Sequence, residues 1–244
     1  MESGFGNSTI NTNDQYIDDA YITLSYATNL ARHASWGMHQ DLVSNAATSP
    51  LSVIAYALLI ALGIPAVKAV WLLTLTLCIV TSRCLWILHN AISPRRTQWH
   101  PALTISVLAT NPLLISTLGL ETFLYATVFL LSVACFVSEQ HLASSVTAGL
   151  LVLARPEGLI PASFLLIAIL RGEGPRRFRT LLAGLALPCA WYFFSWTQLG
   201  SLVPETLMIK KAQASWGNYD FSNGLKLYFK RFPVATCFSL FPLL

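Results

Sequence analysis

Apolar runs of roughly 20 residues, separated by short polar or basic segments, occupy most of the chain between residues 50 and 198. A helix needs about 20 apolar residues to cross a hydrocarbon layer of roughly 30 Å, and a helix satisfies its own backbone groups inside that layer. With 55% hydrophobic and 11% charged residues, the chain is too apolar for an ordinary soluble domain. The sequence therefore predicts an all-α fold, a polytopic bundle of transmembrane helices.

Composition divides the chain into five parts. We expect a polar tail at 1–17, an outer loop with an amphipathic helix at 18–49, a multi-span module at 50–198, an outer loop at 199–230 and the start of an incomplete span at 231–244. Candidate helices in the module are the apolar runs 51–63, 66–90, 101–118, 121–138, 142–170 and 178–198. Pro156 either kinks the run 142–170 or divides it into two short helices. The polar beginning and the short last run give the chain the pattern of a fragment truncated at both ends.

Basic residues set the expected orientation. The strongest basic loop contains Arg171, Arg176, Arg177 and Arg179, and the positive-inside rule places it in the cytoplasm. The segment 95–96 also lies in the cytoplasm if an even number of crossings separates it from Arg171, which requires Pro156 to divide the run 142–170 into two helices. The net charge of +4 is thus a feature of membrane orientation, and nucleic acid is not an expected partner.

Two further residue classes give structural interpretations. Arg83 is costly inside a span, so we expect it to lie near a helix end or to extend toward the interface. The cysteines form no CxxC pair and no metal-ligand spacing, which favours packing roles. No cofactor is predicted, although an acidic pair is able to bind a divalent cation weakly.

Charged residues interrupt the apolar pattern at a few places, and each has a structural alternative. They are the pair Asp18 and Asp19, then Glu121, the pair Arg155 and Glu157, and the pair Lys210 and Lys211. Acidic residues are favourable in the first turn of a helix, which suffices to explain Asp18, Asp19 and Glu121. Arg155 and Glu157 are able to pair across the bend at Pro156, and the lysines suit an interfacial anchor.

In their order along the chain these segments resemble a known family. The segments are "DDAYITLSYATNLA", "TSPLSV", "LGLETFLYA", "LARPEGLI" and "GSLVPETLMIKKA", which together extend from residue 18 to about 212. They resemble the GT-C polyprenyl-phosphate-dependent membrane glycosyltransferases, most of all the terminal arabinofuranosyltransferase type of mycobacterial cell-wall synthesis. The chain departs from that pattern in having no apolar helix before Asp18 and no Asn-Pro-Gly-Glu type turn between residues 37 and 48.

The resemblance implies an inverting glycosyltransferase in the bacterial inner (plasma) membrane, with an outward-facing active site. The donor would be a polyprenyl-phosphate sugar, and the acceptor a cell-envelope glycan or lipid. By motif match, one carboxylate of Asp18 and Asp19 is the catalytic base. Substrate binding falls to Tyr21, Glu121, Arg155, Glu157, Lys210 and Lys211, with His33 and His39 as further candidates for phosphate contact.

The chemistry agrees with those roles. A sugar hydroxyl is a weak nucleophile, so a positioned carboxylate must accept its proton during attack. The phosphate leaving group needs cations or donors for its developing charge, and Arg suits bidentate phosphate contact. Two alternatives remain open at this point: a transporter-like bundle whose acidic pair binds a cation, and a non-catalytic polytopic membrane protein.

Overall fold

The computed structural model describes residues 18–40, 42–92, 103, 106, 110, 115, 117–172, 177–202, 204 and 224–234. All regular secondary structure in these residues is helical, apart from an isolated bridge between His39 and Leu42. The expectation of an all-α fold is confirmed over this part of the chain.

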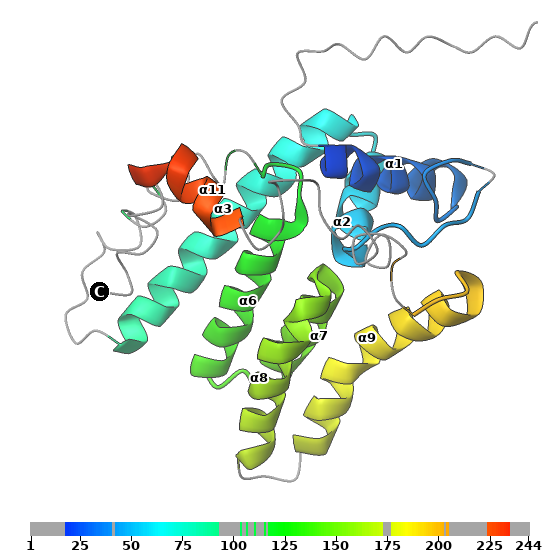
Figure 1. The fold of residues 1–244 in the computed structure, drawn as a ribbon. Coiled ribbons are helices and arrows are strands. Elements are labelled where there is room, and N and C mark those ends of the chain that lie inside the picture. The colour runs from blue at the N-terminus through cyan, green and yellow to red at the C-terminus, as the bar shows by residue number, and fades with distance from the viewer. Residues whose placement is uncertain are drawn as a thin grey trace, which may run out of the picture.

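The first helix, α1 (Asp18–His33), has the amphipathic pattern that the sequence predicts. Its buried positions include Ala20, Leu24 and Ala27, whereas Arg32 is exposed. α1 lies across α2 (Pro50–Ala61) in Figure 1, and the two helices share a core around Val53 and Tyr56. Pro50 opens α2 because its fixed φ suits the first helical turn, and the Ser49 hydroxyl accepts a hydrogen bond from the Ser52 N–H.

Helix α3 (Ala66–Ile92) is the longest described helix, at 27 residues or about 40 Å. Among the described residues it alone is long and apolar enough to cross a membrane. Helices α2, α6 (Glu121–Val137) and α7 (His141–Ala154) are also apolar but shorter. Arg83 is exposed on α3, 4.3 Å from the ring centre of Trp86, which gives its charge a cation–π partner.

The other helices of the bundle are α8 (Leu159–Arg171) and α9 (Arg177–Gln198), and directions alternate from α6 to α9 (Figure 1). Between α7 and α8 lies one 3₁₀ turn, η1 (Pro156–Gly158). Arg155 is extended, with φ −156° and ψ 144°, because a residue before proline is disfavoured in the helical region. Of the two alternatives for Pro156, the chain therefore adopts two short helices.

Nearly all the buried polar side chains among the described residues are serine or threonine hydroxyls. Buried hydroxyls join neighbouring helices: Thr81 to Thr127 at 2.9 Å, Ser144 to the Ser132 carbonyl at 2.9 Å, and Ser145 to the Thr180 carbonyl at 2.6 Å. At Gly184 on α9, an added Cβ would collide with the Ser145 side chain on α7. Small residues and interhelical hydroxyl bonds are typical contacts between membrane helices.

The surface, by contrast, exposes large apolar side chains. Val67, Trp71, Leu75 and Ile79 follow one face of α3 at a spacing of four residues, and all are more than half exposed. α8 and α9 likewise expose apolar side chains, including Phe164 at 71%. An apolar exterior of this extent needs a cover, whether of lipid or of protein.

Of two further expectations, one is wrong in part and the other lies mostly outside the described residues. The segment 199–230 is not entirely a loop, because α11 (Gly224–Arg231) begins within it. That helix is short and basic, so no apolar run marked it in the sequence. The expected helix at 101–118 lies mostly outside the described residues, although Leu103, Ser106, Thr110 and Ile115 are helical.

Candidate functional site

Three of the residues that the sequence singled out come together where α7 ends and α6 begins. Glu121 is the first residue of α6, after a turn in which Gly119 has φ +88°. Such a φ suits glycine, which has no Cβ to clash. Arg155 follows α7 directly, and its side chain reaches both Glu121 and Glu157.

The geometry of this charged group is open rather than tightly closed. Arg155 Nε lies 3.9 Å from Glu121 Oε1 and 3.4 Å from Glu157 Oε2, and Arg155 Nη2 donates to Glu157 Oε1 at 3.4 Å. The first distance is too long for a hydrogen bond. The Glu121 side chain is 16% exposed, against 36% for Arg155 and 64% for Glu157. The pairing of Arg155 with Glu157 is confirmed, and Glu121 is a second carboxylate beside the same guanidinium.

Gly158 explains why the turn after Arg155 is so tight. The chain of η1 folds back on α7, where an added Cβ at Gly158 would collide with the Leu151 carbonyl. Glycine is therefore the residue that allows this close approach. Its position fixes the path of the backbone that carries Arg155 and Glu157.

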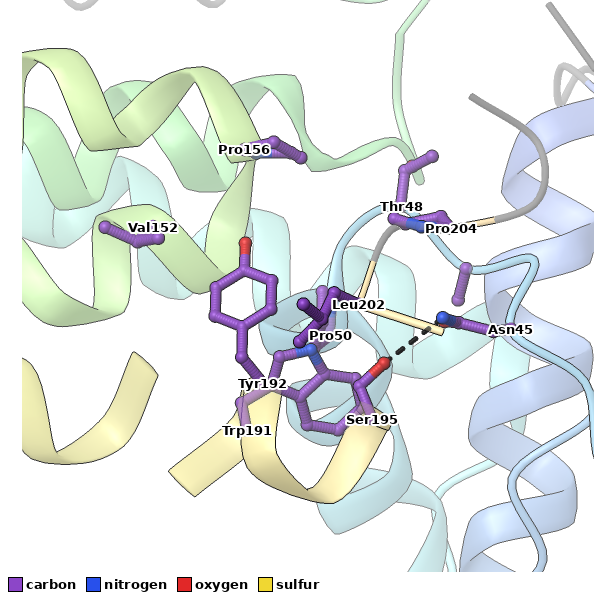
Figure 2. Close-up of a pocket in the computed structure, with 11 residues that line it drawn as sticks. Asn45, Thr48, Pro50, Val152, Pro156, Trp191, Tyr192, Ser195, Leu202 and Pro204 are labelled. Carbon is purple, nitrogen blue, oxygen red and sulfur yellow. Dashed lines mark hydrogen bonds between the residues drawn. The ribbon is translucent and has the colours of Figure 1, made fainter. Parts of the chain in front are cut away.

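A small pocket lies beside this turn, between the end of α9, the end of α7 and the chain before α2 (Figure 2). Its free space is about 10 Å³, enough for about one water molecule. The lining residues are Asn45, Ala47, Thr48, Pro50, Val152, Pro156, Trp191, Tyr192, Ser195, Leu202 and Pro204. A sugar ring does not fit in this volume, so the pocket is a narrow cleft between elements and not a preformed sugar site.

The pocket brings together segments that sequence analysis did not connect. Asn45 comes from the loop after α1, and Ser195 from the last turn of α9. Both are almost completely buried, at 2% and 1% exposed, and they are hydrogen bonded to each other at 3.1 Å. The only sequence signal for this contact was the polar Ser195 inside the apolar run 178–198, and that residue alone does not identify its partner.

The proposed base residues lie at the start of α1. Asp18 and Asp19 are its first two residues, which is also where the structural alternative places favourable carboxylates. Further along α1, the buried hydroxyl of Tyr26 donates to the Ser44 carbonyl at 3.2 Å and accepts from the Ala46 N–H at 3.0 Å. These bonds attach α1 to the loop that follows it.

The remaining predicted residues are distributed as follows. Tyr21 is exposed on α1, and His33 at the end of α1 contacts the Gln40 side chain. His39 lies in the bridge to Leu42 and is exposed. Lys210 and Lys211 lie outside the described residues.

No metal centre is found in the described part of the chain, where no three His, Cys, Asp or Glu side chains are grouped closely enough to hold an ion. The described cysteines Cys78, Cys84, Cys135 and Cys189 are free thiols. Comparison with protein-family models, curated proteins and solved structures finds no match.

Proposed function

We propose that this chain is a membrane glycosyltransferase that moves a sugar from a polyprenyl-phosphate carrier to a cell-envelope glycan or lipid acceptor. One observation carries the proposal: Glu121 and Arg155, from motifs far apart in sequence, meet at one end of the helical bundle, beside a pocket lined by residues of three motifs. We call it the site end, and Ser195, which lies outside the motifs, marks it on α9. The opposite end, the basic end, is marked by Arg171, Arg177 and Arg179.

Contacts between the helices define these two ends. The ion pair between Glu121 and Arg155 aligns the start of α6 with the end of α7. The pocket aligns the end of α9 with η1, because Ser195 and Pro156 both line it. At the other end of α8 and α9, Arg177 donates to the carbonyls of Leu170 and Gly172 at 3.4 and 3.3 Å.

This separation of charge supports a multi-pass topology with the basic end in the cytoplasm. α3 runs parallel to α6, since Leu77 packs with Leu124 and Thr81 pairs with Thr127. If α3 crosses once, the loop with Arg95 joins the cytoplasmic side, and the site end faces outward. Division at Pro156 supplies the even number of crossings that this topology needs between the two basic loops.

The proposed chemistry combines the acidic pair at the start of α1 with the groups of the site end. A carboxylate of Asp18 or Asp19 would accept the proton of the acceptor hydroxyl as it attacks the anomeric carbon. Arg155 would contact the departing phosphate, because its contacts to the two glutamates are long, at 3.4 Å or more, and leave a weak hold for that ligand to displace. Glu121 and Glu157 would keep the guanidinium oriented toward the donor.

Sugar transfer by the full chain in lipid vesicles tests the proposal. The parent chain should transfer labelled sugar from a polyprenyl-phosphate donor, and Asp18→Asn or Asp19→Asn should reduce the rate by about 100-fold or more. Asp14→Asn is the matched control, because Asp14 lies in the polar tail outside the five motifs. Equal transfer by the parent and both variants would remove the acidic pair from the mechanism.

The same vesicles also test the rival interpretation, a transporter-like bundle whose acidic pair binds a cation. Uptake of a labelled solute without any sugar transfer would favour transport and reject the enzyme.

A further inference from the structure

The loop after α1 is attached to the end of α9 by one buried amide. Asn45 Nδ2 lies 3.1 Å from Ser195 Oγ, 3.1 Å from the Ser201 carbonyl and 3.0 Å from Ser201 Oγ. Figure 2 shows Asn45 facing Ser195 across the pocket. The two amide hydrogens are thus shared among three oxygens from residues 150 or more positions away.

The acceptor side of this link is itself ordered. Ser195 Oγ donates to the Ser201 carbonyl at 2.6 Å, which closes the chain after α9 back onto the helix. The rings of Trp36 and Trp191 pack beside it, with centres 4.6 Å apart and planes tilted by 57°. Polar and aromatic contacts therefore hold the same two segments together.

On the donor side, the link continues to the acidic pair. Asn45 is flanked by Ser44 and Ala46, which both bond to the Tyr26 hydroxyl on α1. The path from α9 to α1 thus runs through Asn45 and Tyr26, and both side chains are buried. A shift of the Asn45 loop would move α1, and with it the residues that begin the helix.

We propose that Asn45 is a positioning residue: its amide fixes α1, which carries Asp18 and Asp19, against the part of the bundle that carries Arg155. This inference rests on the proposed function. Asn45 lies outside the five sequence motifs. It would act through the placement of the base rather than by contact with substrate. Displacement of about 1 Å is enough to cost roughly 100-fold in rate.

The structural part of the proposal is tested without activity. In Asn45→Ala, amide hydrogen exchange should rise about tenfold in segments 42–48 and 199–202, because the bonds that join them are lost. Exchange in α6 and α7 should stay unchanged. Asn29→Ala is the matched control: Asn29 Nδ2 donates to the Gly37 carbonyl at 2.8 Å, so this change should affect the loop but leave 199–202 unchanged.

The positioning part is tested by kinetics. Asn45→Ala and Asn45→Asp should each lower kcat about 100-fold, since neither side chain donates to the three oxygens, while the KM for the donor changes by less than about twofold. Asn29→Ala should lower kcat by less than about threefold. An equal loss of kcat in the Asn29 and Asn45 variants would overturn the proposal.

A covalent replacement of the link separates positioning from general folding damage. In a chain whose native cysteines are replaced by serine, Asn45→Cys with Ser201→Cys should regain most of the lost kcat when oxidised and lose it again when reduced. Oxidised and reduced forms of equal activity would reject Asn45 as a positioning residue. If the parent transfers no sugar, the proposed function fails, and hydrogen exchange still decides whether Asn45 links the segments.

Discussion

The guanidinium of Arg155, just after α7, lies 3.9 Å from the carboxylate of Glu121, the first residue of α6. This ion pair differs from the contact between Arg155 and Glu157, which are two residues apart in the chain. Only the pair with Glu121 connects two separate helices. It therefore positions the Pro156 turn relative to the start of α6 and forms the core of the proposed site.

Neutralising Glu121 should affect activity much more than stability. In Glu121→Gln, Arg155 loses one charge partner and is drawn toward Glu157. Because the pair is long and partly exposed, the free energy of unfolding should fall by no more than about 1 kcal/mol. Sugar transfer should fall at least about tenfold, since Arg155 leaves the position proposed for phosphate contact.

Glu139→Gln is the control for that change. Glu139 is exposed just beyond the other end of α6, where it has φ +60°. The substitution removes the same charge far from the site end, so transfer rates should match those of the parent. Equal rates for Glu121→Gln and the parent would contradict the role given to Glu121.

Gly158→Ala should distort the turn that carries Arg155. The new Cβ would collide with the Leu151 carbonyl, which belongs to α7 and has little room to move. Overpacking of this kind costs about 1–3 kcal/mol, and we expect a loss in that range in the free energy of unfolding measured by denaturant titration in detergent.

Gly172→Ala provides the comparison for that prediction. Gly172 is exposed at the end of α8, and the nearest atom to an added Cβ is the Ile169 carbonyl at 3.3 Å. A small shift relieves this contact, so the change should be within about 0.5 kcal/mol. A Gly158→Ala protein as stable as Gly172→Ala would mean that the turn is looser than the structure indicates.

Local features of the sequence predicted much of this fold. Apolar runs gave the positions of α2, α3, α6 and α9 to within a few residues, because chain breaks at Gly63, Pro65 and Gly119 are strong local signals. The pairing of Arg155 with Glu157 was likewise accessible, since the two residues are near in sequence.

Contacts between distant segments were beyond that reasoning. Glu121 was expected to begin a helix and, from the family resemblance, to bind substrate, but its partner Arg155 depends on how α6 and α7 pack. Asn45 lies in a polar loop with no periodic pattern, and its partners Ser195 and Ser201 are brought to it only by the folded bundle. One-dimensional patterns identify the charged residues of the site, whereas packing determines which of them meet.

The hydroxyl pair between α3 and α6 should contribute a small, measurable coupling. Thr81 Oγ1 and Thr127 Oγ1 are buried and 2.9 Å apart, and Thr127 also donates to the Phe123 carbonyl. In a double-mutant cycle of Thr81→Val and Thr127→Val, the coupling should be about 0.6 kcal/mol and no more than about 1.7 kcal/mol. Thr76→Val is the control, because the exposed Thr76 bonds only to Leu72 of its own helix.

Lysine substitution along the exposed face of α3 tests whether that face contacts lipid. Leu75 is 59% exposed in the interior of the helix, and Val67 is 52% exposed on the same face at its second residue. On a water-exposed face, either change would be nearly neutral. In a membrane, lysine near the helix centre costs about 2.5–3.5 kcal/mol, whereas lysine near an end reaches the interface.

We therefore expect Leu75→Lys to reduce the fraction of chain that stays in the membrane after alkaline extraction, and Val67→Lys to leave it near the parent value. A side-chain effect unrelated to depth would reduce both equally. If both variants integrate as well as the parent, α3 does not cross the bilayer at Leu75. The proposed topology, with the site end outside, would then be wrong, because it requires α3 to cross the membrane once.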